Sequence, residues 1–98
     1  MNKNLIYIIE GLLRENARAR DDDAYLYAKV CNRINPEAMR VPFVVVISQL
    51  KDYGLPGYDT VTRLRRRIQS EHPELRASDQ VEDWRTEKET KARAGIFR

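Results

Sequence analysis

The chain has 98 residues, of which 42% are hydrophobic and 34% are charged, and this length accommodates one domain with one modest core. The 18 Lys and Arg residues exceed the 15 Asp and Glu residues by only three, so an anion-binding hypothesis depends on local clustering of charge. The single cysteine, Cys31, excludes an internal disulfide, and the longest apolar run, residues 41–47, is too short to span a bilayer.

The N-terminal stretch predicts an amphipathic helix that Asn2 or Asn4 can cap. Its wide apolar face suits the core or a dimer contact, and we favour the core. This face consists of Leu5, Ile6, Ile8, Ile9, Leu12 and Leu13. No small-residue cleavage site follows the stretch, so we predict no signal peptide and a cytoplasmic protein.

Three consecutive carboxylates, Asp21 to Asp23, precede a second predicted helix that ends near Asn35. Clustered carboxylates suit a hard cation, but the glycine and closing glutamate of an EF-hand loop are absent. We therefore favour an N-cap and first-turn role for these acids.

The only histidine, His72, has no evident partner for catalysis or metal binding. The sequence predicts neither a metal nor a cofactor, and no pattern in it predicts an enzyme.

The segment from Pro42 to Tyr53 follows a predicted loop at residues 36–40 and has two interpretations. Its β-branched run, residues 44–47, fits a buried strand. Its length of twelve residues, its helical spacing and the stop at Gly54 favour a helix. We predict a helix, whose apolar positions are Phe43, Ile47 and Leu50.

A tight turn and an arginine-rich helix follow, at residues 54–70. Gly54 suits a helix C-cap, and Pro56 and Gly57 end the first helix and turn the chain. The second helix carries an apolar stripe of Val61, Leu64 and Ile68, which we expect to pack against Phe43, Ile47 and Leu50. A helix, a glycine turn and a second helix with a polar outer face are the layout of a helix-turn-helix unit.

The outer face of the arginine-rich helix carries the functional hypothesis. At about 100° per residue, Arg65 lies near the buried edge, while other arginines and hydroxyl side chains point outward. Most arginine-rich helices simply present a solvated basic face, but guanidinium groups also match phosphate oxygens and guanine edges. We predict DNA binding, with a dimer on a two-fold site. The predicted contacts are Thr62, Arg63, Arg66 and Arg67, with Tyr58 and Ser70 as peripheral phosphate contacts.

The last predicted helix covers residues 79–94, after Pro73 has ended the arginine-rich helix and Ser78 has provided a cap. Val81 and Trp84 are its evident packing pair, and we expect them to anchor its start on the core. The sequence thus predicts an all-α domain of four or five helices with a helix-turn-helix-like unit over residues 1–86. Residues 87–98 form a charged helix end or tail that frays or is held by a partner, such as a second copy.

Two segments, LPGYDTVTRLRR at residues 55–66 and EHPELR at residues 71–76, are similar to a pattern in small helical proteins of bacteriophages and prophages. Residues 19–23 and 26–27 also resemble this family, so that the similarity covers residues 19–85. The resemblance implies a helical, helix-turn-helix-like phage protein in the host bacterial cell. Gly57 stands where the pattern has serine, which weakens the helix start slightly.

A phage origin implies two further hypotheses. Small phage proteins inhibit host defence enzymes such as CRISPR effectors, whose nucleic-acid grooves are basic. An anti-CRISPR inhibitor of this kind presents acids, here at residues 21–23 and 82–89, or contacts guide RNA through arginines. The other hypothesis is a non-enzymatic protein-interaction module that uses Ile96 and Phe97.

Overall fold

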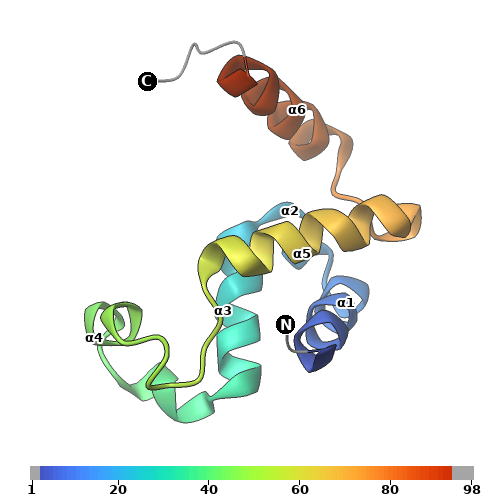
Figure 1. Ribbon diagram of the computed structural model, residues 1–98. Helices are drawn as coiled ribbons and strands as arrows, with labels where there is room; N and C mark the ends of the chain where they lie inside the picture. The colour runs from blue at the N-terminus through green and yellow to red at the C-terminus, as the bar shows by residue number, and fades with distance from the viewer. Residues whose placement is uncertain (1–2, 94–98) are drawn as a thin grey trace.

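The computed structural model describes residues 3–93, which contain α-helices and short 3-10 helices and no strand (Figure 1). The predicted all-α class is therefore confirmed. The α-helices are α1 (Lys3–Glu15), α2 (Ala17–Asp21), α3 (Asp23–Ile34), α4 (Phe43–Ser48), α5 (Tyr58–Glu71) and α6 (Asp79–Arg93). The 3-10 helices are η1 (Pro36–Arg40) and η2 (Pro73–Leu75). None of the described helices is long and apolar enough to cross a bilayer.

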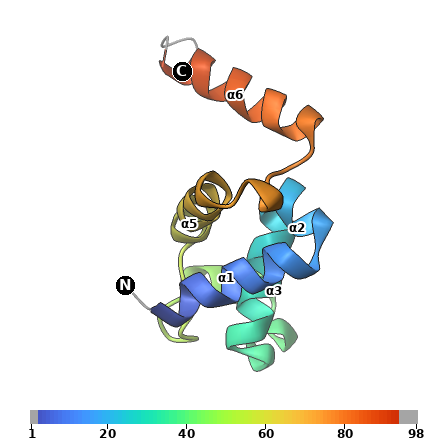
Figure 2. The ribbon, with the colours of Figure 1, turned by 90° about the vertical axis from the view of Figure 1, so that its right-hand side faces the viewer.

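The core lies where α1, α3 and α5 pack against one another (Figure 2). Each helix contributes one apolar stripe at helical spacing, which is why three short helices close around a single core. The fully buried side chains of the core include Ile9, Leu13, Leu26, Val30, Val61 and Leu75. The apolar face of the first helix thus packs in the core of the same chain, as favoured from sequence.

The helix boundaries follow from local chemistry. Asp22 caps α3, because its Oδ1 accepts a hydrogen bond of 3.1 Å from the Tyr25 amide. Asp23 follows in the first turn, where its negative charge is favoured by the helix dipole. The capping role predicted for this acidic run is confirmed, and Cys31 on the same helix is buried.

The segment between α3 and α5 differs from its predicted form. Residues 36–40 form η1 rather than an irregular loop, and only Phe43–Ser48 of the predicted helix is helical. The β-branched residues of α4 are poor helix formers. Ser48 Oγ also donates a 2.9 Å bond to the Val45 carbonyl, which competes with the helical pattern. The strand interpretation is wrong, and residues 49–54 form turns.

The predicted packing of α4 on α5 is wrong. Phe43 and Ile47 are exposed, and α5 packs on α1 and α3 instead. The six residues of α4 bury only Val46, and the helix is set to one side of α3 (Figure 1). The helix-turn-helix-like unit stays a prediction.

The last helix, α6, stands away from the other helices in both views (Figures 1 and 2). The predicted anchor is wrong, because Trp84 is 58% exposed and its ring lies 5.0 Å from the Lys88 ammonium. Val81 is only half-buried. The predicted tail lies partly in α6, which runs to Arg93, and its residues 94–98, with Ile96 and Phe97, fall outside the described residues.

Candidate nucleic-acid interface

The turn before α5 fixes where this helix starts. Gly54 has φ of 69°, in the left-handed region that favours glycine. The Leu55 amide then bonds back to the Leu50 carbonyl at 2.9 Å, and the Leu55 side chain is buried. The Tyr27 hydroxyl donates to the Pro56 carbonyl at 2.8 Å and ties the turn to α3. The turn predicted from its glycine and proline residues is therefore anchored to the fold at both Leu55 and Pro56.

The inner side of α5 fixes the direction of its outer side. Val61, Leu64 and Ile68 are buried, as predicted. Arg65 and Gln69 are buried on the same side of the helix, and Arg65 therefore cannot serve as a surface cation. With these five positions held in the fold, the remaining face of α5 points to solvent.

The predicted arginines project from this outer face. Arg63 is exposed and makes no hydrogen bond or ion pair with any residue that the structure describes. Arg67 Nε lies 3.1 Å from Glu71 Oε1, and Arg66 Nε lies 3.8 Å from Glu89 Oε1. Both pairs are solvent-exposed and therefore weak. A phosphate oxygen can replace either carboxylate without leaving a buried charge behind.

The structure divides the predicted contact residues into two groups. Tyr58, Thr62, Arg66 and Ser70 line a groove of about 950 Å³ between α5 and α6. Arg63 and Arg67 lie outside this groove, on the flank of α5 that α6 does not face. Thr62 Oγ1 donates to the Asp59 carbonyl at 3.1 Å, within its own helix. The two flanks of α5 therefore offer a ligand different chemistry.

Tyr58 is half-exposed at the start of α5 and packs edge-on against Tyr27, with ring centroids 5.3 Å apart. Burial, and then the charges of Asp23 and Asp22, raise the pKa of the Tyr58 phenol above its usual value. The hydroxyl therefore stays protonated at neutral pH and can donate a hydrogen bond to an anion.

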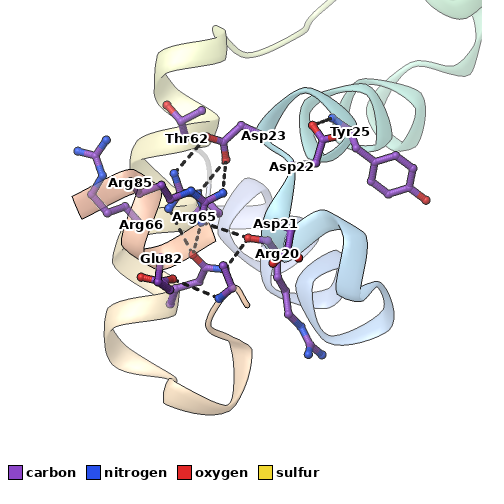
Figure 3. Close-up of polar contacts among 12 residues, drawn as sticks. Arg20, Asp21, Asp22, Asp23, Tyr25, Thr62, Arg65, Arg66, Glu82 and Arg85 are labelled. Atoms are coloured by element: carbon purple, nitrogen blue, oxygen red, sulfur yellow. Dashed lines mark hydrogen bonds and ion pairs between the residues drawn. The ribbon is translucent and has the colours of Figure 1, made fainter. Parts of the chain in front are cut away.

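Four of the carboxylates that line the α5–α6 groove make hydrogen bonds or ion pairs that stabilise the fold. Asp21 Oδ1 accepts the Ser78 amide at 2.8 Å, ahead of α6. Asp22 caps α3, and Glu82 Oε1 accepts the Ala77 amide at 3.2 Å. Asp23 receives two guanidinium groups (Figure 3). Among the described residues, no group of three His, Cys, Asp or Glu side chains is suited to holding a metal ion.

A buried polar network under this groove holds α6 to the core. Arg65 makes two bonds to Asp23, from Nε to Oδ1 at 2.9 Å and from Nη2 to Oδ2 at 3.2 Å. Arg85 reaches in from α6, with Nη2 3.5 Å from Asp23 Oδ1 and Nη1 3.2 Å from the Arg20 carbonyl (Figure 3). Gln69 accepts from both guanidinium groups and donates to the Leu75 carbonyl at 2.9 Å.

This network contains the residues that the sequence reasoning missed. The position of Arg65 beside the apolar stripe signalled that it is buried, but nothing local identified Asp23 or Arg85 as its neighbours. Burial, and next the charge of Arg65, lower the pKa of Arg85 from its usual value. The charges of Asp23, Glu82 and Asp21 offset part of this effect on the pKa of Arg85.

No known protein family, curated protein or solved structure matches this chain.

Proposed function

We propose that the chain is a nucleic-acid-binding protein that holds DNA through the outer face of α5, in a regulatory role and in the cytoplasm of a phage's host cell. The proposal rests on one observation: Arg63, Arg66 and Arg67 project to solvent from a helix whose other face is fixed in the core. Their guanidinium groups present a row of hydrogen-bond donors that matches phosphate oxygens. Because the helix is already anchored, binding does not have to order its backbone.

The unequal flanks of α5 assign unequal roles. Arg63 and Arg67 lie on the open flank, and Arg63 pairs with no carboxylate in the part of the chain that the structure describes. Arg66 leaves Glu89 to reach a phosphate beside them, at little cost because the pair is exposed. Tyr58, Thr62 and Ser70 face the groove beside α6, so their hydroxyls act as secondary contacts. The main contact is therefore the edge of α5 that carries Arg63 and Arg67.

The acids at residues 21–23 support this proposal over an inhibitor that would use them. An inhibitor that mimics nucleic acid needs outward carboxylates that are free to meet a basic groove. The carboxylates at residues 21–23 instead have partners in the same chain. Asp21 accepts a hydrogen bond from the Ser78 amide, and Asp22 accepts one from the Tyr25 amide at the start of α3. Asp23 forms ion pairs with Arg65 and Arg85. Employing the three carboxylates outside the fold would break these contacts.

The test is a fluorescence-anisotropy titration of labelled duplex DNA over a range of salt concentrations. The variant R63A/R67A removes the two open-flank arginines. We expect at least a tenfold loss of affinity, and a salt dependence whose slope falls by about 2, since each phosphate contact contributes about 0.9. Both replaced side chains are exposed, so the circular dichroism spectrum should not change.

The matched control is R18A/R33A, which removes the same charge from exposed positions outside α5. It should lower the affinity far less, because only long-range attraction is lost. Equal losses in the two double variants, or no binding by the natural chain, would refute the proposed interface. Titrations with single-stranded DNA and with duplex RNA of the same sequence give Kd values that show which kind of nucleic acid the chain binds most tightly.

A further inference from the structure

The helix α4 exposes apolar side chains on most of its surface. Phe43 and Val44 are 72% and 70% exposed, and Val45 and Ile47 are 37% and 40% exposed. Met39 of η1 adds to the same apolar surface at 45%. No charged residue occurs from Val41 to Leu50. A helix that is apolar all round is normally buried, and a contiguous apolar patch of this kind marks an interaction site.

A groove of about 360 Å³ lies beside these exposed side chains. Its walls are almost entirely apolar and come from α3, η1, α4, the turn before α5 and Tyr58 at the start of α5. They include Tyr27, Ala28, Cys31, Ala38, Val46 and Leu50. Phe43 stands at the edge of this groove as a protruding side chain. One surface of the molecule therefore carries both an aromatic projection and an apolar hollow.

We propose that this surface binds a second copy of the chain in a two-fold dimer. Phe43 of each protomer inserts into the groove of the other. A two-fold axis places the same surface on both partners, so a projection and a hollow that lie side by side complement each other twice. The proposal uses none of the α5 arginines, which carry the main contact of the proposed nucleic-acid interface, and the two sites share only Ala24 and Tyr58 among the residues that line their grooves.

The size of the groove fits this occupant. A cavity of about 150 Å³ is enough to bind benzene. The groove, at about 360 Å³, therefore accommodates the phenyl ring of Phe43 together with a neighbouring aliphatic side chain such as Val44. The exposed apolar side chains offer a few hundred Å² on each protomer. With a polar rim, pairing two such surfaces buries on the order of 1,000 Å², which is the lower range of specific interfaces.

The charge pattern also favours a second copy. A surface of one sign repels its own copy, whereas the α4 surface has no charge at its centre. Near it, Arg40 Nη1 lies 3.8 Å from Glu37 Oε2, and both side chains are highly exposed. Because this rim holds both signs, a two-fold arrangement can bring unlike charges together. Nothing in the patch selects a charged partner such as nucleic acid or an acidic peptide.

The primary test is sedimentation equilibrium of the full chain up to about 100 µM, where a small interface of this kind should be dimeric with Kd in the micromolar range. Two variants target the two halves of the contact. F43E places a charge on the projection, at a helix start where an acid is tolerated. A28R places a long charged side chain at the exposed Ala28 position of the groove wall, where arginine suits the helix interior.

We expect at least a tenfold rise in Kd for each variant, so that each is mainly monomeric at concentrations where the natural chain is mainly dimeric. An equimolar mixture should dimerise again, since the intact Phe43 of A28R meets the intact groove of F43E. At the other contact, the two introduced charges have opposite signs. The matched control Y7E changes another aromatic residue, 71% exposed on α1, and should leave the dimer intact.

A natural chain that stays monomeric throughout would overturn the proposal, as would dimers of F43E and A28R with unchanged Kd. A mixture that stays monomeric would overturn the reciprocal geometry. The variant R63A/R67A distinguishes a failure of the dimer proposal from a failure of the DNA-binding proposal. It should remain dimeric whether or not it binds DNA. Circular dichroism of F43E and A28R shows that a loss of association is not a loss of folding.

Discussion

The ion pair between Arg65 and Asp23 should stabilise the fold far more than an exposed pair on the same helix. Its side chains are 7% and 24% exposed, and it joins residues 42 positions apart in the chain. The exposed pair, Arg67 with Glu71, has a similar shortest distance, 3.1 Å against 2.9 Å, but its side chains are 62% and 57% exposed. The two pairs therefore differ mainly in burial and in what they connect.

The expected magnitude follows from these contacts. Hydrogen bonds to charged groups contribute about 1.5–3 kcal/mol each, and removing one partner of a buried pair costs about 3–5 kcal/mol. The partial exposure of Asp23 and the nearby Arg85, 3.5 Å from it, reduce this loss. We expect R65M to lower the free energy of unfolding by about 2–4 kcal/mol, and methionine keeps most of the buried apolar stem.

A double-mutant cycle isolates the interaction. Urea unfolding of R65M, D23A and the double variant should give a coupling energy of about 1.5–3 kcal/mol. The control cycle, with R67M and E71A, should give only about 0.3–0.5 kcal/mol, as for other exposed pairs four residues apart on a helix. Similar couplings in the two cycles would refute the conclusion that burial makes the first pair strong.

Three further predictions concern Tyr27 and Cys31. Replacing Tyr27 with Phe removes the 2.8 Å bond to the Pro56 carbonyl and should cost about 1–2 kcal/mol in urea unfolding, whereas Y58F should cost less because the Tyr58 ring is half-exposed. The Cys31 thiol is 3% exposed, and burial raises its pKa above the usual 9.0. Iodoacetamide at pH 8 should therefore label it at least about 100-fold faster in denaturant than in the native protein. Equal labelling rates would contradict the burial of Cys31. Burial also raises the pKa of Tyr27 above the usual 10.0, and the unfolded chain therefore loses these protons first. Stability should fall as the pH rises above about 9, with a smaller fall in a Y27F/C31A variant measured against its own value at pH 7.

The parts of the fold that depend on near neighbours in sequence could be predicted from the sequence. The stripe of Val61, Leu64 and Ile68 follows from helical spacing, and its burial is confirmed. The turn at Gly54 and the capping acids before α3 likewise follow from local chemistry. Such features depend on residues within about one helical turn, which a sequence displays directly.

The parts that depend on distant partners could not be predicted. Helical spacing predicted that Phe43 packs on α5, and the pairing of Trp84 with Val81 predicted that Trp84 packs on the core. Both are exposed, because α4 has only six residues and lies to one side of α3, and α6 turns another face inward. Arg85, on that inner face, can be partly buried because Asp23, 62 positions earlier in the sequence, lies opposite it. The outward face of α5 was predictable, whereas its division by α6 was not.

The contacts that hold α6 to the core are polar, and this determines the energetics of its release. None of its described side chains is buried, and Arg85 and the Ser78 amide join it to the core through polar contacts. Releasing α6 would therefore expose little apolar surface, and both the heat-capacity change and the urea dependence of that step would be small. Amide protons of α6 should then exchange with solvent at nearly the same rate with or without moderate urea, while those of α5 exchange only through unfolding that urea promotes.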